Sequence, residues 1–305
     1  MPERSALEEI YSAIDTTARV LDVPCDRDKV QPVLNAYGDG IASGLMVFTM
    51  AAGESRRGDF DYNFTVPADG PDPYAVAVAN GFTPRTDHPV GSLLSDIAER
   101  SPLQFYGAEC GVVEGFKKTY AFFPLDDLQR ASKLADIPSV PPSLGENLSL
   151  LAGYGLDDNV SIVGIDYVHR TMNVYFGRFS ADHIEPGTVR SLLRDIGMPE
   201  LSDEMLGFTR NAFSIYPTFS WDSPGITRIC FSLVTQDPRA LPAVLEPEIG
   251  RFVRNTPYAY EGEDDRILVY GATLSARGEY WKAGVYHRRP AEYWSKVQLF
   301  DKIVN

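Results

Sequence analysis

Hydrophobic residues near the start of the chain recur at steps of three and four positions, which is the period of an amphipathic helix. Further along, short segments alternate hydrophobic and polar residues with a period of two, as half-buried strands do. The two patterns follow each other in the order helix, helix, strand, strand. This order occurs roughly five times along the 305 residues, without recognisable identity between the units, so it predicts a repeat of organisation.

The pattern places helices at residues 7–21, 27–37, 72–81, 89–100, 126–134, 143–154, 186–196, 202–210, 238–254 and 291–303. It places strands at residues 41–50, 59–66, 103–109, 117–123, 160–167, 171–176, 212–218, 226–234, 266–273 and 279–287. Short turns within each strand pair predict antiparallel hairpins. An open sheet of this size leaves two edges to protect, and closure removes both. We therefore predict one α+β domain over residues 1–305, a ten-stranded antiparallel β-barrel surrounded by helices, in five ααββ units.

One face of the predicted strands is rich in tyrosine and in single basic residues. Its members include Lys118, Tyr120, His169, Asn173, Tyr175, Ser214, Tyr216, Arg228, Lys282 and Tyr286. A solvated outer face is the commonest arrangement for such strands. The pattern nevertheless favours a lumen, because helices outside the barrel need the apolar face to pack against, and the only carboxylates in the polar sets are Asp59 and Asp61.

Three basic residues, Lys118, Arg228 and Lys282, come from three different hairpins and have no obvious local acidic neighbour on their own face. Buried cations require partners, since an unpaired one costs several kcal/mol. The set therefore predicts a lumen that binds a multiply charged anion, most simply a phosphate or diphosphate.

The overall charge restricts the possible partners. The formal net charge is −14, which disfavours nucleic acid and anionic membranes. Three scattered cysteines indicate reduced thiols, and the charged N-terminus lacks the apolar segment of a signal peptide. We expect a cytoplasmic protein.

Phosphate-binding glycine loops, the DDxxD magnesium motif and metal-type histidine spacing are missing from the sequence.

Several segments resemble the soluble aromatic prenyltransferases with the ABBA or PT-barrel fold, and they look closest to the naphterpin-type branch. They are DRDKV (26–30), GFKKTYAFFP (115–124), IPSVPPSLGEN (137–147), IDYVHRTMNVYF (165–176), FSIYPTFSW (213–221), ITRICF (226–231), LVYGATLS (268–275) and EYWKAGVYH (279–287). The resemblance covers essentially the whole chain, and GFKKTYAFFP is its most specific motif. The family fold is a ten-stranded barrel of ααββ units, in agreement with the pattern above.

The resemblance implies roles for individual residues. The diphosphate of the donor would be bound by Lys118, Tyr120, His169, Asn173, Tyr175, Tyr216, Arg228 and Lys282. The aromatic acceptor would lie near Ser161, Ile162, Phe213, Ser214, Val269, Tyr286 and Tyr293. Lys118, Arg228, Lys282 and Tyr286 would be the catalytic residues.

The sequence also departs from the family pattern. His169 stands where the naphterpin-type enzyme has a further diphosphate-binding lysine. Asp61 matches the magnesium-linked aspartate, but Glu109 and Thr49 replace its usual Asp and Ser neighbours. Several family members work without metal, and we expect Mg²⁺ not to be strictly required here. Ser161 and Tyr293 replace acceptor-contacting glutamines, so the resemblance does not identify the acceptor.

The implied activity is electrophilic aromatic substitution in secondary metabolism and antibiotic biosynthesis. A monomeric enzyme would transfer a dimethylallyl or geranyl group from its diphosphate to an electron-rich phenazine, naphthalene or phenol. A non-catalytic carrier of an isoprenoid or aromatic metabolite is the alternative, because it needs the same lumen without the diphosphate cluster. A phosphate-ester hydrolase is a third hypothesis, disfavoured by the missing metal motif.

Overall fold

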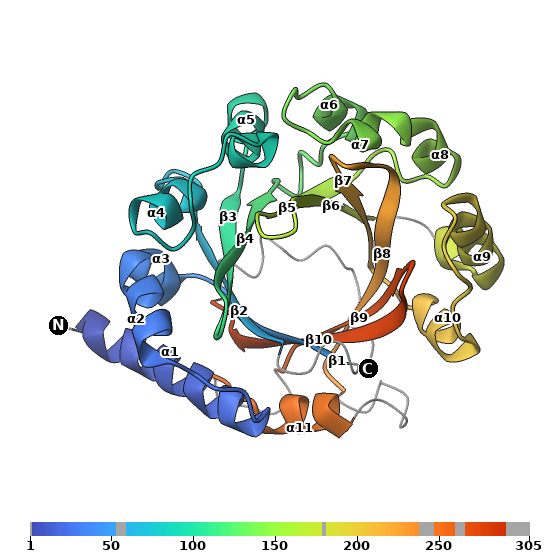
Figure 1. Cartoon of the computed structure of the whole chain (residues 1–305). Coiled ribbons are helices and arrows are strands. Elements are labelled where there is room, and N and C mark those ends of the chain that lie inside the picture. Colours follow the sequence, from blue (N-terminus) through green and yellow to red (C-terminus); the bar gives the residue numbers. More distant parts are fainter. Residues whose placement is uncertain (1, 53–58, 179–180, 238–246, 260–265, 291–305) are drawn as a thin grey trace.

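Ten antiparallel strands close into a barrel in the computed structural model, which describes residues 2–52, 59–178, 181–237, 247–259 and 266–290. The strand order around the barrel is β1-β10-β9-β8-β7-β6-β5-β4-β3-β2, so the first and last strands pair and close it (Figure 1). The strands are β1 (Met46–Ala52), β2 (Phe60–Pro67), β3 (Phe105–Gly111), β4 (Gly115–Phe122), β5 (Val160–Asp166), β6 (Thr171–Gly177), β7 (Ser214–Ser220), β8 (Ser223–Thr235), β9 (Leu268–Ser275) and β10 (Gly278–Arg288). The predicted fold class is confirmed.

Helices surround the barrel on its outside (Figure 1). They are α1 (Pro2–Val20), α2 (Arg27–Ala36), α3 (Gly38–Ser43), α4 (Pro73–Ala79), η2 (Pro89–Gly91), α5 (Leu93–Arg100), α6 (Ala131–Ala135), α7 (Pro142–Glu146), α8 (Leu148–Gly153), η3 (Ala181–Ile184), α9 (Pro186–Asp195), α10 (Asp203–Thr209) and α11 (Pro247–Asn255). Side-chain caps begin several of them. Asp26, Asp72 and Ser202 accept hydrogen bonds from the first free backbone N–H groups of α2, α4 and α10, respectively.

The predicted strand at residues 41–50 was wrong in its first half, because residues 38–43 form helix α3 and the strand begins at Met46. Glycines explain the difference. A Cβ atom on Gly40 would lie 2.5 Å from Cγ1 of Val66, and one on Gly44 would lie 2.4 Å from the carbonyl oxygen of Thr65. Helix α3 therefore packs against β2 at a distance that only glycine allows, a tertiary contact that the hydrophobic pattern does not reveal.

Several predicted helices differ in extent from the observed ones. Residues 126–134 were expected to be helical, but α6 begins only at Ala131, because Gln129 pairs through its backbone with Val160 at the start of β5. The helix predicted over residues 89–100 is divided into η2 and α5 at Ser92, and the one predicted over 143–154 is divided into α7 and α8 at Asn147. The predicted final helix at residues 291–303 and the first part of the helix predicted at 238–254 lie outside the described residues.

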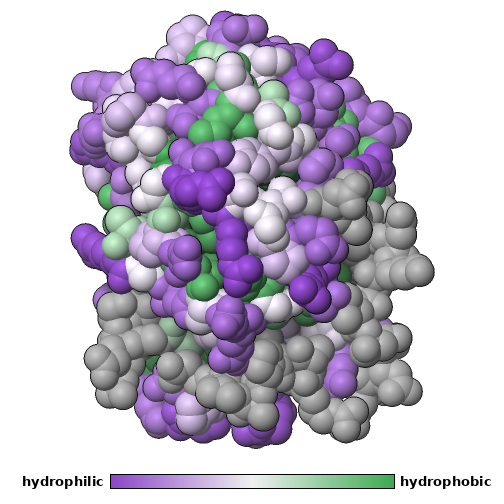
Figure 2. All heavy atoms as spheres, turned by 90° about the vertical axis from the view of Figure 1, so that its right-hand side faces the viewer, coloured by the Kyte–Doolittle hydropathy of each residue, from purple (hydrophilic) through white to green (hydrophobic). Residues whose placement is uncertain are grey.

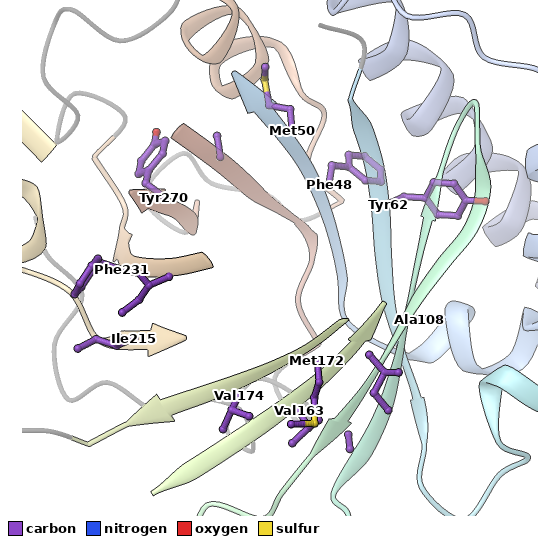
Figure 3. Close-up of a cluster of buried hydrophobic side chains, with 14 of the residues drawn as sticks. Phe48, Met50, Tyr62, Ala108, Val163, Met172, Val174, Ile215, Phe231 and Tyr270 are labelled. Carbon is purple, nitrogen blue, oxygen red and sulfur yellow. The ribbon is translucent and has the colours of Figure 1, made fainter. Parts of the chain in front are cut away.

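The hydrophobic core lies between the outer face of the barrel and the helices. Large side chains of this layer, drawn in Figure 3, include Phe48, Tyr62, Phe231 and Tyr270, each no more than 1% exposed. They alternate along their strands with the polar residues of the other face. The predicted separation of faces is therefore confirmed, and the apolar face is the one that the helices cover.

The side of the molecule that carries α9 and α10 is mostly hydrophilic. Figure 2 shows that hydrophobic residues form only small areas among polar ones on this side. In the described part of the chain, no helix combines the length and hydrophobicity that crossing a bilayer requires.

The two ends of the barrel differ in their connections. The strand pairs β3–β4, β5–β6, β7–β8 and β9–β10 are joined by short turns at one end, which we call the hairpin end. The segments that contain the helices connect the pairs at the opposite end, which we call the helix end. A residue's position along its strand therefore gives its height in the lumen.

Candidate functional site

The barrel encloses a cavity of about 1020 Å³, at the upper end of the range for small-molecule pockets. Its walls change character with height. Charged and hydroxyl side chains line the half near the hairpin end, and mostly apolar ones line the half near the helix end. The predicted lumen is thus present, with distinct places for an anionic group and for an apolar one.

Strand register brings acidic and basic residues together on one wall. Glu109 of β3 pairs with Lys118 of β4, and Lys118 pairs with Asp166 of β5. The ammonium of Lys118 lies 2.5 Å from Oε1 of Glu109 and 3.9 Å from Oδ2 of Asp166. The expectation that Lys118 lacks an acidic partner was wrong, because its partners come from neighbouring strands. Burial opposes ionisation of Glu109, but Lys118, Tyr120 and Lys117 together outweigh this effect and lower the pKa of Glu109 below its ordinary value.

A β-bulge turns a second lysine into the lumen. The pairing of β3 with β4 shifts between Glu109 and Cys110, so Lys117 and Lys118 both line the cavity although they are adjacent in sequence. Nζ of Lys117 lies 2.9 Å and 3.1 Å from the two oxygens of Asp61. Burial and the neighbouring Glu109 raise the pKa of Asp61 to about 6, against the opposing effect of Lys117.

Asp61, the residue that the resemblance links to magnesium, is paired with an ammonium group. Both of its oxygens accept from Lys117, so a cation bound there would compete with that ammonium for the carboxylate. Glu109 is likewise occupied by Lys118 and Tyr120. Within the described residues, no group of three or more His, Cys, Asp and Glu side chains could bind a metal ion.

His169 lies in the turn between β5 and β6, at the hairpin end of the lumen. Its Nδ1 is 3.2 Å from both oxygens of Asp166, and its backbone N–H donates to Oδ1 of the same carboxylate at 2.8 Å. Burial alone would raise the pKa of Asp166, but the hydrogen bonds from His169 and the charge of Lys118 lower it to about 2. The side chain of His169 is 65% exposed, so it sits at the rim.

Arg228 reaches the lumen from β8 and is held by uncharged groups. Its Nε donates to Oγ1 of Thr218 at 3.2 Å, and its Nη2 lies 3.5 Å from Oδ1 of Asn173. Thr218 in turn donates to the same Asn173 oxygen at 2.7 Å. Within the part of the chain that the structure describes, Arg228 has no carboxylate at ion-pair distance. The hydrogen bonds to Thr218 and Asn173 therefore orient its guanidinium group, but no negative charge compensates it.

Lys282 of β10 is a second lumen cation that has no acidic partner at ion-pair distance among the described residues. Its side chain faces the lumen, and its ammonium lies 5.9 Å from the centre of the Tyr280 ring. Burial lowers the pKa of Lys282 below its ordinary value, and the nearby charges of Arg228 and Lys118 act in the same direction. An anion bound between Arg228 and Lys282 would favour the charged form of Lys282 and so counteract both burial and the repulsion by the other cations.

Three tyrosines line the middle of the lumen. Tyr175 and Tyr216 are stacked, with ring centres 4.2 Å apart, and Tyr120 lies edge-on to Tyr175 at 6.4 Å. Two glycines make room for Tyr120. A Cβ on Gly164 would lie 3.0 Å from the Tyr120 ring, and one on Gly107 would lie 3.2 Å from it.

Most of the residues predicted to contact the acceptor lie near the helix end. Ile162, Phe213, Ser214, Val269 and Tyr286 line the cavity there. Ser161 does not line it, since a register shift at the start of β5 turns its hydroxyl toward the carbonyl of Tyr175 at 3.2 Å. Tyr293 lies outside the described residues.

The pattern of alternation missed several charged lumen residues, among them three of the charged wall. Lys117 has the parity of the outer face, and only the doubled lysine in GFKKTYAFFP signals a bulge. Glu109 and Asp166 belong to strands that were not sorted into faces, and their partners depend on the pairing of β3, β4 and β5. The lumen therefore contains more negative charge than the sequence suggested.

A closed ten-stranded barrel of ααββ units, with a charged half and an apolar half in one lumen, is the architecture of the PT-barrel aromatic prenyltransferases. The comparisons with known proteins lead to the same class. The chain belongs to the aromatic prenyltransferase Orf2 family, whose model matches residues 5–294. It is therefore a prenyltransferase.

Curated relatives align along nearly the whole chain. A 5,10-dihydrophenazine-1-carboxylate 9-dimethylallyltransferase of Streptomyces anulatus is 46% identical, covering 94% of this chain and 95% of the relative. A furaquinocin biosynthesis prenyltransferase of Streptomyces sp. (strain KO-3988) is 42% identical, covering 92% and 89%, respectively. A flaviolin linalyltransferase of Streptomyces virginiae is 39% identical, covering 92% of each.

A solved structure shares the fold at low sequence identity. The 6-dimethylallyltryptophan synthase from Micromonospora olivasterospora, in complex with DMASPP and Trp, matches with a TM-score of 0.57 and 11% identity. The match covers 91% of this chain and 96% of the synthase. It supports the barrel architecture and carries no information about substrates.

Proposed function

We propose that this enzyme transfers a dimethylallyl group from dimethylallyl diphosphate to an electron-rich polycyclic aromatic acceptor of the phenazine or naphthalene class. The observation that carries this proposal is the division of the lumen into a half with unneutralised cations and an apolar half. The names of the relatives support the substrate classes, since they include a dimethylallyl donor and phenazine and flaviolin acceptors. The cavity volume leaves room for a donor and a ring system side by side.

The diphosphate would bind near the hairpin end, between Arg228 and Lys282. These two cations lack carboxylate partners among the described residues and lie on opposite sides of β9, the strand between them. Lys118 would contribute from across the lumen, and Asn173, Tyr175 and Tyr216 line the wall between these positions. His169 would contact an outer phosphate oxygen, because its ring lies at the rim.

The chemistry follows from this placement. As the bond between the allylic carbon and oxygen breaks, its electron pair leaves with the diphosphate, and fixed positive charge stabilises that developing anion. The allylic cation would lie against the sides of the Tyr175 and Tyr216 rings that line the cavity, where cation–π contact contributes up to about 2 kcal/mol when water is excluded. A ring carbon of the acceptor then forms the new bond, and the ring loses a proton.

The acceptor would lie toward the helix end, against Phe213, Val269 and Tyr286. These side chains form one apolar cluster with Leu45, Val234 and Ile267. An aromatic ring held there would lie next to Tyr175 and Tyr216, against which the allylic group is placed.

We further propose that transfer does not strictly require Mg²⁺. The support is the occupation of Asp61 by Lys117, which places an ammonium where a divalent cation would otherwise bind. Lys117 is then a fixed positive charge close to Lys118.

The proposal is tested by incubating the purified enzyme with dimethylallyl or geranyl diphosphate and with dihydrophenazine carboxylate, flaviolin or dihydroxynaphthalenes, followed by mass spectrometry. We expect a product larger by one dimethylallyl group, formed with EDTA as well as with Mg²⁺. A geranylated product alone would contradict the donor assignment. Loss of transfer in EDTA that Mg²⁺ restores would contradict the metal assignment. Binding of the donor without any product would favour the carrier.

A further inference from the structure

Glu109 lies at the centre of the charged wall and is occupied on both oxygens. Its side chain is buried in the middle of β3, and the whole residue is only 5% exposed. Oε1 accepts from the ammonium of Lys118 at 2.5 Å, and Oε2 accepts from the hydroxyl of Tyr120 at 2.5 Å. One carboxylate therefore holds two side chains that were both expected to bind the diphosphate.

The hydrogen bond to Glu109 determines which groups of Tyr120 are available to a substrate. A tyrosine hydroxyl has one proton to donate, and here that proton is directed to Oε2 of Glu109. Tyr120 then presents oxygen lone pairs and its ring to the lumen. The ring lies over Gly107 and Gly164, where any larger residue would crowd it. In this state Tyr120 favours a cation and donates no hydrogen bond to a phosphate oxygen.

The same carboxylate fixes the height of Lys118. The ammonium is held between Glu109 on one neighbouring strand and Asp166 on the other, at 2.5 Å and 3.9 Å. The charge of Lys118 is consequently compensated by a carboxylate in the free enzyme, unlike the charges of Arg228 and Lys282. Its position is set before any substrate enters, so ordering of this long side chain does not have to accompany donor binding.

We infer that Glu109 is a positioning residue for prenyl transfer, which holds Lys118 in place and directs the proton of Tyr120 away from the diphosphate. This inference rests on the proposed function. It reassigns Tyr120 from the diphosphate-binding set to the residues that face the allylic cation. Glu109 touches neither substrate in this scheme and acts only through its two neighbours.

The substitution Glu109→Gln tests the inference with little change in shape. The amide has one acceptor oxygen, so either Tyr120 or Lys118 loses its partner, and the amide N–H can donate to the tyrosine oxygen. We expect kcat to fall roughly 10- to 100-fold, the cost of a misplaced group near the reacting atoms. Glu109→Gln removes a negative charge beside Lys118, and the stronger attraction of Lys118 to the diphosphate should offset the loss of its ordering. The affinity for dimethylallyl thiolodiphosphate, an unreactive donor analogue, should therefore stay unchanged or become tighter.

A double-mutant cycle with Tyr120→Phe shows whether Glu109 acts through Tyr120. If it does, the double variant loses less activity than the product of the two single losses. If Glu109→Gln does not fold, Tyr120→Phe alone remains decisive, because we expect it to lower kcat and leave the affinity for the analogue unchanged. Glu114→Gln is the matched control, since Glu114 pairs with Lys117 from an exposed position and should give wild-type rates.

Three results would overturn the inference: wild-type kcat in Glu109→Gln, weaker binding of the analogue in parallel with the loss of kcat, or independent effects in the double-mutant cycle. Each presupposes that the wild-type enzyme transfers a prenyl group. Failure of the wild-type enzyme to do so would instead overturn the proposed function.

Discussion

Lys118 and Lys282 are two lumen lysines that should respond in opposite ways to the same substitution. Lys282 has no acidic partner among the described residues, and burial lowers its pKa. Lys118 forms an ion pair with the buried Glu109 and lies near Asp166. Replacement of either lysine by methionine removes the charge and keeps the length of the side chain.

The expected magnitudes follow from what each substitution leaves behind. Lys282→Met removes an unpaired cation whose burial costs free energy. Because the lumen keeps some access to solvent, we expect the free energy of unfolding to rise by only about 1 kcal/mol. Lys118→Met leaves the carboxylate of Glu109 buried without its cation, which should lower the free energy of unfolding by about 3 kcal/mol. Both variants should bind the donor more weakly. Loss of one partner of a buried charge pair with the diphosphate corresponds to about 3 kcal/mol, a hundredfold or more in Kd.

The assay is denaturant unfolding of the free protein, together with calorimetric titration by dimethylallyl thiolodiphosphate. The combination of higher stability and weaker binding in Lys282→Met is the distinctive result, since a purely structural lysine would not give it. The reasoning is refuted if Lys282→Met destabilises the protein as Lys118→Met does, or if it binds the analogue with wild-type affinity.

Two further predictions concern pH. Donor binding requires the charged form of Lys282, and burial lowers the pKa of this residue, so the affinity for the analogue should begin to decline at a lower pH than it would with an ordinary lysine. Lys282→Arg stays charged and should retain its affinity to higher pH in calorimetric titrations. Identical pH profiles of the two proteins would contradict this prediction. The pKa of Asp166 is lowered from 3.8 to about 2, so its ionised form stabilises the folded state at pH values above its unfolded pKa and this stabilisation is lost as pH falls through about 2. Asp166→Asn should therefore lower the free energy of unfolding by about 2 kcal/mol at neutral pH, with a difference that shrinks in acid; an equal difference at all pH values would show that ionisation of Asp166 is not its cause.

The strand pattern was sufficient to predict the barrel. Alternation along each hairpin identified the lumen face that carries Tyr175, Tyr216, Arg228 and Lys282, and the structure places all four in the cavity. This succeeded because a strand buried on both sides must direct its polar residues to one face and its apolar residues to the other.

The interactions of the charged wall could not be predicted in the same way. Alternation gives the face of a residue and not its neighbour on the next strand, so the contacts of Glu109 with Lys118 and Tyr120 required the register of β3 and β4. The bulge that admits Lys117 breaks the alternation itself. Helix α3 was mistaken for strand because its close approach to β2 depends on Gly40 and Gly44, whose role is visible only in three dimensions.

The central claim is that the donor diphosphate binds in the charged half of the lumen without a metal ion. A crystal structure of the enzyme with dimethylallyl thiolodiphosphate, grown with and without Mg²⁺, tests it most directly. We predict the diphosphate between Arg228 and Lys282, within reach of Lys118, with the bond between Lys117 and Asp61 intact in both crystals. A diphosphate bound elsewhere, or a Mg²⁺ ion on Asp61 with Lys117 displaced, would contradict the account.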